Sequence, residues 1–104
     1  MISFDEAVYD VLRRVPIGSV TTYKEIAIKL NTKAYRRVGL ALKNNPYAPI
    51  VPCHRVVKND GSIGGFMGEI SGPTITKKID LLRDEGVFVS NGKVLNFPSI
   101  CWRG

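Results

Sequence analysis

A cysteine directly precedes the only histidine of the chain, within the segment Pro52-Cys53-His54-Arg55-Val56-Val57. The thiolate of a cysteine is a strong nucleophile, whereas a free thiol titrates at about pH 8.5. The positive potential of His54 and Arg55 is expected to favour the thiolate of Cys53. A lone cysteine is more often a small buried apolar residue, so a nucleophile and a structural role stand as alternatives.

His54 is the candidate base beside this nucleophile, and a histidine that acts as a base needs an orienting partner. Neighbouring side chains in an extended segment point to opposite sides, so a water or an unusual turn would have to connect His54 to Cys53. Spacing alone does not choose the partner among the downstream acids, which are Asp60, Glu69, Asp80, Asp84 and Glu85.

Three helices are predicted before the cysteine. Residues 3–6 form a capping box that opens an amphipathic helix running to about Arg14. Residues 22–25 form a second capping box, which opens a short helix through Leu30. After a tight turn, a third helix is expected over residues 33–43.

The third helix has two different faces. The apolar face is expected to be buried and comprises Ala34, Val38, Ala41 and Leu42. The opposite face is mainly basic and comprises Lys33, Arg36, Arg37, Leu40 and Lys43. Two short helices joined by a turn, the second of them basic, indicate a DNA-binding helix-turn-helix. The alternative is a helical hairpin with a solvated face.

The segment that carries the cysteine is expected to be extended, followed by a hairpin and a loop. Residues 47–51 are apolar and lead into Pro52. Residues 56–63 predict a hairpin with its turn at Asp60-Gly61, which would form a wing beside the helix-turn-helix. Residues 64–68 are rich in glycine and could bring the backbone close to a ligand.

The last third of the chain predicts one more helix and one more hairpin. Thr74 is expected to cap the helix, and Gly86 suits its C-terminal end. Asn91-Gly92 suits a type I′ turn between two short strands. The tail carries Cys101 and Trp102 as expected packing residues. Together the elements predict a mainly α fold with small β hairpins, a winged-helix-like helix-turn-helix DNA-binding domain.

Size and charge fit a small domain that binds a polyanion. The chain has 104 residues, 44% of them hydrophobic, a net charge of +6 and a pI of about 9.6. Basic proteins of this kind bind phosphates by releasing counterions, although general solubility explains the charge equally well. With two cysteines, no zinc-motif spacing and no long apolar run, we expect no disulfide, no metal and no membrane association. The expected location is the cytoplasm, or the nucleus of a eukaryote.

Four sequence motifs occur in a fixed order within residues 4–86. They are Pro16-x-Gly18-x-Val20-Thr21-Thr22-Tyr23, then Arg36-x-Val38-Gly39-x-Ala41 followed by Asn45-Pro46, the cysteine segment itself, and Leu81-Leu82-x2-Glu85-Gly86. In this order and spacing they resemble the O6-alkylguanine-DNA alkyltransferase family, the methylated-DNA–protein-cysteine methyltransferases.

The resemblance implies a role for each residue of the site. Cys53 would accept the alkyl group, and His54 would take the thiol proton through a bridging water. Glu85 would orient His54, and Asn45 would brace the turn that holds the active-site segment. Tyr23 would contact the extruded base and donate a proton to the leaving purine.

The resemblance also implies how DNA is handled. The target guanine would be flipped out of the duplex, because its O6 alkyl group is not placed for in-line attack inside the stack. Arg36 would enter the base stack in its place. The expected DNA-binding residues are Lys33, Arg36, Arg37, Leu40, Lys43 and Tyr23, and the expected pocket residues are Leu42, Val56, Phe66, Met67 and Gly68.

The implied reaction is direct-reversal DNA repair by a monomer that needs no cofactor. The thioether formed on Cys53 is stable, so each molecule would react once with double-stranded DNA containing O6-alkylguanine. Phe66 and Met67 replace a tyrosine and a small polar residue that relatives often carry, which leaves the range of accepted alkyl groups open. Residues 1–104 are expected to be a single catalytic and DNA-binding domain, the C-terminal domain of this family without its N-terminal one.

Three other functions are compatible with parts of the sequence. Non-enzymatic lesion-binding relatives flip the base without transfer, but they lack the acceptor cysteine that this chain has at position 53. A winged-helix regulator would bind specific duplex sequences, usually as a dimer, with Cys53 structural. A Cys-His hydrolase would need an oxyanion hole, for which the sequence offers no candidate.

Overall fold

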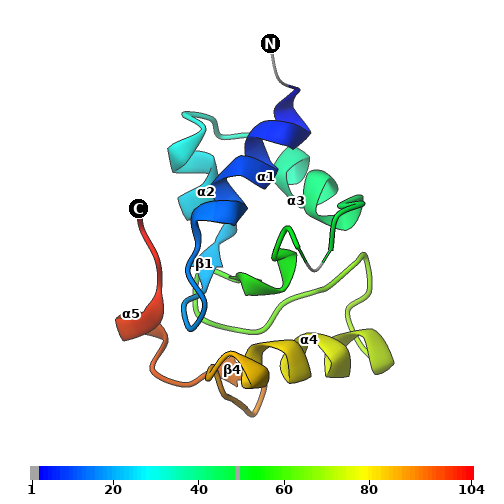
Figure 1. Cartoon of the computed structure of the whole chain (residues 1–104), viewed down its shortest axis with the longest axis vertical. Coiled ribbons are helices and arrows are strands. Elements are labelled where there is room, and N and C mark those ends of the chain that lie inside the picture. Colours follow the sequence, from blue (N-terminus) through cyan, green and yellow to red (C-terminus); the bar gives the residue numbers. More distant parts are fainter. Residues whose placement is uncertain (1–2, 49) are drawn as a thin grey trace.

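The computed structural model describes residues 3–48 and 50–104 and places five α-helices and four short strands among them. The helices are α1 (Phe4–Arg14), α2 (Tyr23–Lys29), α3 (Tyr35–Lys43), α4 (Pro73–Asp84) and α5 (Phe97–Ile100), with a 3₁₀ turn, η1, at Cys53–Arg55. The strands are β1 (Thr21–Thr22), β2 (Val56–Val57), β3 (Val89–Ser90) and β4 (Lys93–Val94). Figure 1 shows α1, α2 and α3 together at one end, α4 at the other, and the green η1 segment between them. None of the described helices is long and apolar enough to cross a membrane.

The first two helices begin at their predicted caps. The Ser3 hydroxyl accepts a hydrogen bond from the Glu6 amide at 3.2 Å, and α1 ends at Arg14 before Pro16. The Thr22 hydroxyl accepts from the Glu25 amide at 3.1 Å and opens α2. Both helix starts were therefore predictable from short local patterns.

The predicted start of the third helix is wrong by two residues. The Thr32 hydroxyl accepts a hydrogen bond from the Ala34 amide at 3.1 Å, which holds this stretch in a turn. As a result α3 begins at Tyr35, and Lys33 lies outside it. Ala34 is exposed at the N-cap rather than buried, whereas the other members of the apolar face are buried as predicted: Val38, Ala41 and Leu42.

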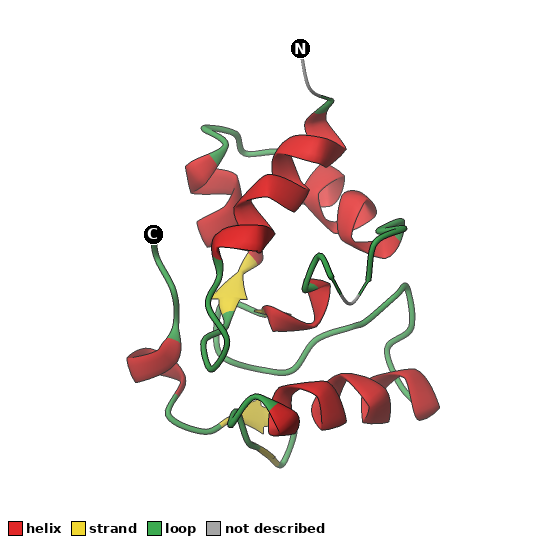
Figure 2. Cartoon of the chain, in the orientation of Figure 1, coloured by secondary structure: helices red, strands yellow, loops and turns green. Residues whose placement is uncertain are grey.

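The predicted hairpin over residues 56–63 is also wrong. Val56–Val57 forms β2, which pairs in parallel with β1, in the register Thr21 with Val56 and Thr22 with Val57. The turn after β2 does form, because the Lys58 amide donates to the Ser62 carbonyl at 3.0 Å. Ser62 then bridges to Lys93 instead of continuing a ladder with β2. The strands β1 and β2 therefore link two distant segments in the interior and do not form a protruding wing (Figure 2).

The short β1–β2 pair separates two apolar clusters. Successive side chains of a strand point to opposite faces. Val56 accordingly packs into the cluster formed by α1, α2 and α3, whereas Val57 packs into the cluster beneath α4. The strand that follows the cysteine thus joins both halves of the core.

The helix α4 begins at Pro73 after an N-cap at Gly72, so the predicted cap at Thr74 is wrong. Residues 87–102 pack against β1 and α4. Gly86, at a φ of 83°, ends α4 in the left-handed region as predicted. The β3–β4 hairpin turns at Asn91 and Gly92, whose positive φ values fit the predicted type I′ turn. The tail then runs beside β1, where the Trp102 amide donates to the Val20 carbonyl at 2.6 Å. The short helix α5 in this tail was not predicted.

Candidate active site

Cys53 lies on a 3₁₀ turn that is braced from the end of α3. The buried Asn45 amide group donates to the Val51 carbonyl at 2.9 Å and accepts from the Tyr47 amide at 2.9 Å. A further hydrogen bond, from the Val51 amide to the Tyr47 carbonyl, closes the same stretch at 3.0 Å. The expectation of an extended segment over residues 47–51 is therefore wrong for its described residues, because Asn45 holds them in a turn; residue 49 lies outside the described residues.

Glu85 is the acid that faces His54, and it comes from the C-terminal end of α4. His54 Nε2 lies 2.9 Å from Glu85 Oε2. Arg55 binds the same carboxylate through two further hydrogen bonds of 2.8 Å, and its third contact is the Val15 carbonyl at 2.7 Å. Burial alone would raise the pKa of Glu85, but the hydrogen bonds from Arg55 and His54 outweigh it and lower that pKa. Glu85 is therefore a carboxylate at neutral pH.

His54 is buried and neutral at physiological pH. Burial lowers its pKa, and the nearby charges of Arg55 and Lys78 act in the same direction against the opposing effect of Glu85. A neutral imidazole whose Nε2 donates to Glu85 has Nδ1 free to accept a proton. Among the described residues, no group forms a hydrogen bond with the buried His54 Nδ1. The imidazole is thus held in a tautomer suited to a base.

The expected stabilisation of the Cys53 thiolate by its two sequence neighbours is wrong. Burial raises the pKa of Cys53, and the effects that partly oppose burial come from an Asn45 hydrogen bond and the Lys78 charge. His54 contributes no charge because it is neutral, and the Arg55 charge is taken up by Glu85. The resting group is therefore a thiol that must lose its proton in order to react.

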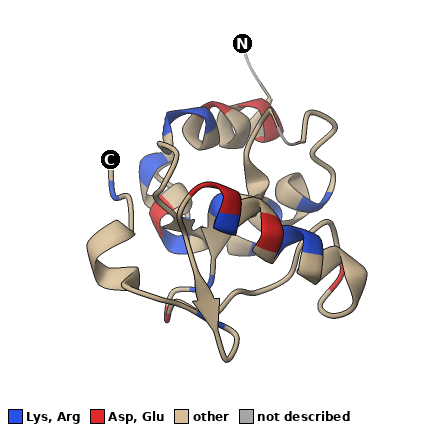
Figure 3. Ribbon diagram, turned by 60° about the horizontal axis from the view of Figure 1, so that its bottom comes forward, with Lys and Arg blue, Asp and Glu red and all other residues tan. Residues whose placement is uncertain are grey.

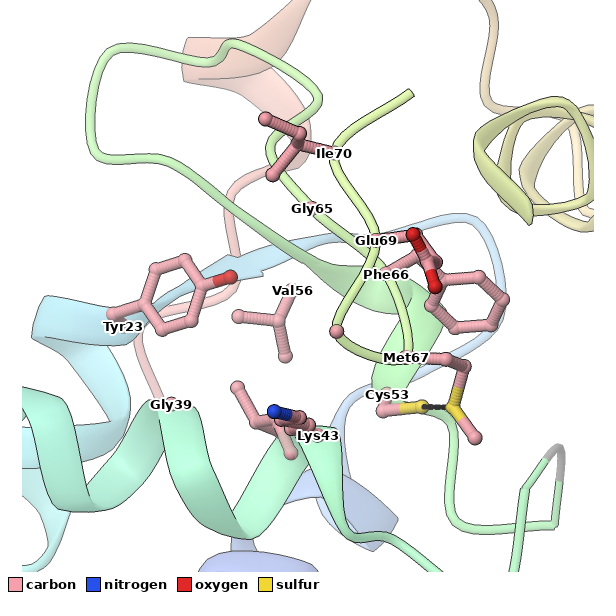
Figure 4. Close-up of a pocket in the computed structure, with 12 residues that line it drawn as sticks. Tyr23, Gly39, Lys43, Cys53, Val56, Gly65, Phe66, Met67, Glu69 and Ile70 are labelled. Carbon is pink, nitrogen blue, oxygen red and sulfur yellow. Dashed lines mark hydrogen bonds between the residues drawn. The ribbon is translucent and has the colours of Figure 1, made fainter. Parts of the chain in front are cut away.

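A cavity of about 300 Å³ opens beside Cys53 (Figure 4). Its lining is mainly apolar and comes from α2, α3, the strand β2 and the glycine-rich loop. The lining residues are Tyr23, Gly39, Leu42, Lys43, Cys53, Val56, Gly65, Phe66, Met67, Gly68, Glu69 and Ile70. All five residues expected to form a pocket therefore line one cavity together with Cys53.

The loop over the cavity is a tight two-residue hairpin. Phe66 and Glu69 exchange backbone hydrogen bonds of 2.8 and 2.9 Å, and Met67 and Gly68 between them have φ values of 53° and 84°. Positive φ at both central positions is the geometry of a type I′ turn. This turn places Met67 Sδ 3.9 Å from Cys53 Sγ (Figure 4). Phe66 is buried and packs in the core, so Met67 is the residue of this pair that limits the space above the sulfur.

Tyr23 stands at the opposite wall of the cavity, at the start of α2. Burial raises its pKa, and a charge on Cys53 would raise it further. The phenol is therefore protonated at neutral pH and is available as a hydrogen-bond donor to a group in the cavity.

The outer face of α3 carries the expected basic residues. Arg36, Leu40 and Lys43 are exposed on this helix, and Lys33 is exposed just before it. Arg37 points instead toward α1, where it pairs with Asp5 and lies 5.2 Å from the centre of the Phe4 ring. Its guanidinium group is thus engaged within the protein, whereas the described residues offer Arg36 no such partner.

Charge is segregated along the chain around this helix. Both α1 and α4 contain acidic as well as basic residues (Figure 3). Between Glu25 and Asp60, by contrast, the chain has no acidic residue. The basic residues of this interval are Lys29, Lys33, Arg36, Arg37, Lys43, Arg55 and Lys58. Arg37 and Arg55 pair with Asp5 and Glu85, whereas Lys33, Arg36 and Lys43 give the exposed side of α3 its positive charge.

The chain also matches a known protein family. Residues 3–87 match the family described as 6-O-methylguanine DNA methyltransferase, DNA binding domain. The chain belongs to this family. It is 45% identical over 89 residues to the methylated-DNA–protein-cysteine methyltransferase of Archaeoglobus fulgidus, covering 83% of this chain and 58% of that protein. The enzyme of the same name from Methanosarcina barkeri is 47% identical over 64 residues, which are 61% of this chain and 40% of that enzyme.

Solved structures show the same fold. Mycobacterium tuberculosis OGT in complex with DNA has a TM-score of 0.70 and 38% identity, covering 82% of this chain and 50% of that one. S. pombe ATL in complex with DNA has a TM-score of 0.80 and 33% identity, and the match covers all of both chains. S. pombe Atl1 in complex with damaged DNA containing O6-carboxymethylguanine has a TM-score of 0.72 at 30% identity, covering 99% of this chain and all of that one. The mainly α fold with a helix-turn-helix is therefore confirmed, and the chain spans about half the length of the methyltransferases it matches.

Two residues of the site were not given a role by sequence reasoning. Arg55 was treated only as a source of positive potential, although it binds Glu85. Lys78 was missed entirely, although its position offered a signal. It lies three residues after Ile75 and four before Leu82, which places it on the apolar face of α4. A lysine in that register is unusual enough to mark it for attention.

Proposed function

We propose that this protein repairs DNA by direct reversal, transferring the alkyl group of O6-alkylguanine irreversibly to Cys53 in a single turnover. The observation that carries the proposal is the buried arrangement of Cys53 beside a cavity, with His54 held by Glu85 at 2.9 Å. Family membership adds support, because the relatives named above are methylated-DNA–protein-cysteine methyltransferases.

In the proposed reaction the Cys53 proton passes through a water to His54 Nδ1, while Glu85 stabilises the imidazolium that forms. The sulfur then attacks the alkyl carbon in line. The S–C bond forms as the C–O6 bond breaks, and the electron pair leaves with the guanine. Tyr23 donates a hydrogen bond or proton to the purine as its negative charge develops. The S-alkylcysteine product is a thioether, so the molecule is consumed.

The cavity is proposed to receive a guanine flipped out of the duplex. The Met67 amide would donate to the guanine O6, and Leu42 and Val56 would pack against the base. Unstacking costs a few kcal/mol and less for a lesion that pairs poorly, which would favour damaged sites. No cofactor takes part in this scheme, because the alkyl group comes from the DNA itself.

The exposed side of α3 is proposed to face the DNA. Arg36 would insert into the stack, with Lys33, Leu40 and Lys43 contacting the duplex beside it. Arg37 would have a smaller part than expected, since it pairs with Asp5. We further propose that residues 1–104 carry the catalytic and DNA-binding functions in one domain, acting as a monomer.

Lesion binding without transfer is the second candidate. Two observations favour it: the pKa of Cys53 is raised, and the Met67 thioether lies 3.9 Å from its sulfur. The full-length likeness to S. pombe ATL, which was crystallised with DNA, is compatible with it. Cys53 itself argues for the first candidate, because binding alone needs no nucleophile.

Intact mass spectrometry separates the two candidates. The protein is mixed with a duplex that contains one O6-methylguanine, and Cys53→Ser serves as the control. A gain of one methyl group on the wild type alone, limited to one per molecule, is expected. Tight binding to the lesion without any mass gain would instead establish a lesion-binding protein.

A further inference from the structure

Lys78 is completely buried in α4, with none of its surface exposed. Its ammonium group is not paired with a carboxylate among the described residues. It donates instead to three backbone carbonyls, those of Val56 at 2.8 Å, Ile63 at 2.5 Å and Gly65 at 3.0 Å. An ammonium group has three protons, so each proton has one acceptor.

Burying a charge without an opposite charge is costly, and few proteins keep a lysine in such a place. An apolar residue at this position would continue the apolar face of α4. Packing alone therefore does not account for this lysine, and its three acceptors show where it acts.

The three carbonyls belong to two segments that meet at the cavity. Val56 is the first residue after the turn that carries Cys53, and its side chain lines the cavity. Ile63 and Gly65 lead into the tight turn that holds Met67 over the sulfur. One ammonium group thus connects the floor of the cavity to the loop that covers it.

We propose that Lys78 is a positioning residue, which fixes the glycine-rich loop relative to Cys53 and supplies the buried positive charge that makes the thiolate accessible. The positioning role rests on the proposed alkyl transfer, whereas the effect on the thiol does not. Sequence adjacency suggests Arg55 and His54 for this charge, but neither provides it.

The surroundings of Cys53 leave Lys78 as its cation. The titratable groups whose charges interact with Cys53 are Tyr9 from α1, Tyr23 from α2 and Lys78 from α4. The two phenols are neutral at pH 7, since burial raises the pKa of each. Burial lowers the pKa of Lys78 to about 8, although the attraction of a charge on Cys53 acts in the opposite direction. The two groups therefore stabilise each other in their charged forms.

The test measures the titration of Cys53 without DNA. The rate of iodoacetamide reaction is followed from pH 6 to pH 11.5 in Lys78→Met, with Cys101→Ser as the background so that only one thiol reacts. Lys77→Met is the matched control, because Lys77 is exposed on the same helix. We expect the midpoint to rise by about one pH unit in Lys78→Met, which makes the reaction at pH 7.5 about tenfold slower. Lys77→Met should match the background protein.

A folded Lys78→Met with an unchanged midpoint would overturn the proposal. If Lys78→Met does not fold, Lys78→Arg decides, because arginine keeps the positive charge. An iodoacetamide midpoint near that of the background protein supports the charge role. A rise of about one pH unit contradicts it. Methyl transfer from O6-methylguanine DNA is measured in parallel and should slow by more than the loss of thiolate explains, since the loop is also released. A background protein that takes no methyl group refutes the proposed function, and its iodoacetamide midpoint still decides the role of the charge.

Discussion

His54 and Glu85, which are 31 positions apart in the sequence, form a 2.9 Å hydrogen bond between Nε2 and Oε2. The carboxylate is itself fixed by Arg55, whose guanidinium group binds both of its oxygens and also the Val15 carbonyl after α1. The orientation of the imidazole therefore depends on the end of α1, the end of α4 and the 3₁₀ turn together. A base held from three elements loses little freedom when it takes a proton.

Replacing Glu85 with glutamine should destabilise the protein in a pH-dependent way. The pKa of Glu85 is lowered in the folded state, so its carboxylate contributes stability above pH 4.5 that is lost as the pH falls through the folded value. Glu85→Gln should lower the free energy of unfolding at pH 7 by about 1–3 kcal/mol, and the difference should shrink below pH 4.5. Urea unfolding at pH 7, 5, 4 and 3 measures this.

The matched control for this prediction is Asp84→Asn, since Asp84 is the exposed neighbour of Glu85. It should change stability by less than about 0.5 kcal/mol. A loss in Glu85→Gln that stays constant down to pH 3 would mean that the carboxylate charge is not what the fold uses.

Local signals explain why much of the fold was predictable. The caps at Ser3 and Thr22, the C-terminal Gly86 and the Asn91-Gly92 turn each depend on a few neighbouring residues. The pairing of β2 with β1 joins residues 35 positions apart, and no local pattern encodes it. A favourable turn at Asp60-Gly61 suggested a hairpin instead.

The candidate site was likewise predictable in part, because some of its contacts depend on tertiary packing. Motif resemblance predicted a site formed by Cys53, His54, Asn45 and Glu85, and these residues lie near one another in the structure. It could not show that Arg55 is occupied by Glu85, because that contact depends on how α4 packs. The charge acting on Cys53 was consequently assigned to its sequence neighbours, whereas it comes from Lys78 across the core.

Arg36→Ala should slow methyl transfer from duplex DNA at least tenfold, yet leave the reaction with free O6-alkylguanine base nearly unchanged. The side chain is exposed on α3 and is not among the residues that line the cavity, so only base extrusion should depend on it. Single-turnover rates on both substrates measure the effect. An equal loss on duplex and free base would exclude a role in extrusion.

Arg37→Ala is the informative neighbour for that experiment. Arg37 pairs with Asp5 and stacks near Phe4, so its removal should reduce thermal stability modestly while transfer from duplex DNA falls less than in Arg36→Ala. Reversed effects of the two substitutions would show that Arg37, and not Arg36, acts on the DNA.

Met67→Gly should widen the range of accepted alkyl groups. The methionine holds a positive φ of 53°, which glycine adopts readily, and its sulfur lies 3.9 Å from Cys53 Sγ. The rate with free O6-benzylguanine should therefore rise relative to that with O6-methylguanine, while the fold is retained. The ratio of the two rates is the measurement, and an unchanged ratio would mean that Met67 does not limit the cavity.

Asn45→Ala should weaken both the fold and the reactive thiol. Its buried side chain satisfies the Val51 carbonyl and the Tyr47 amide, and leaving such groups unpaired costs about 1–3 kcal/mol. Asn45 also lowers the pKa of Cys53, so the iodoacetamide midpoint should move upward in the variant. Asn44→Ala is the control, because Asn44 is exposed at the end of α3. A stability loss without any shift of the midpoint would limit Asn45 to bracing the turn, whereas both effects together would make the end of α3 part of the nucleophile's environment.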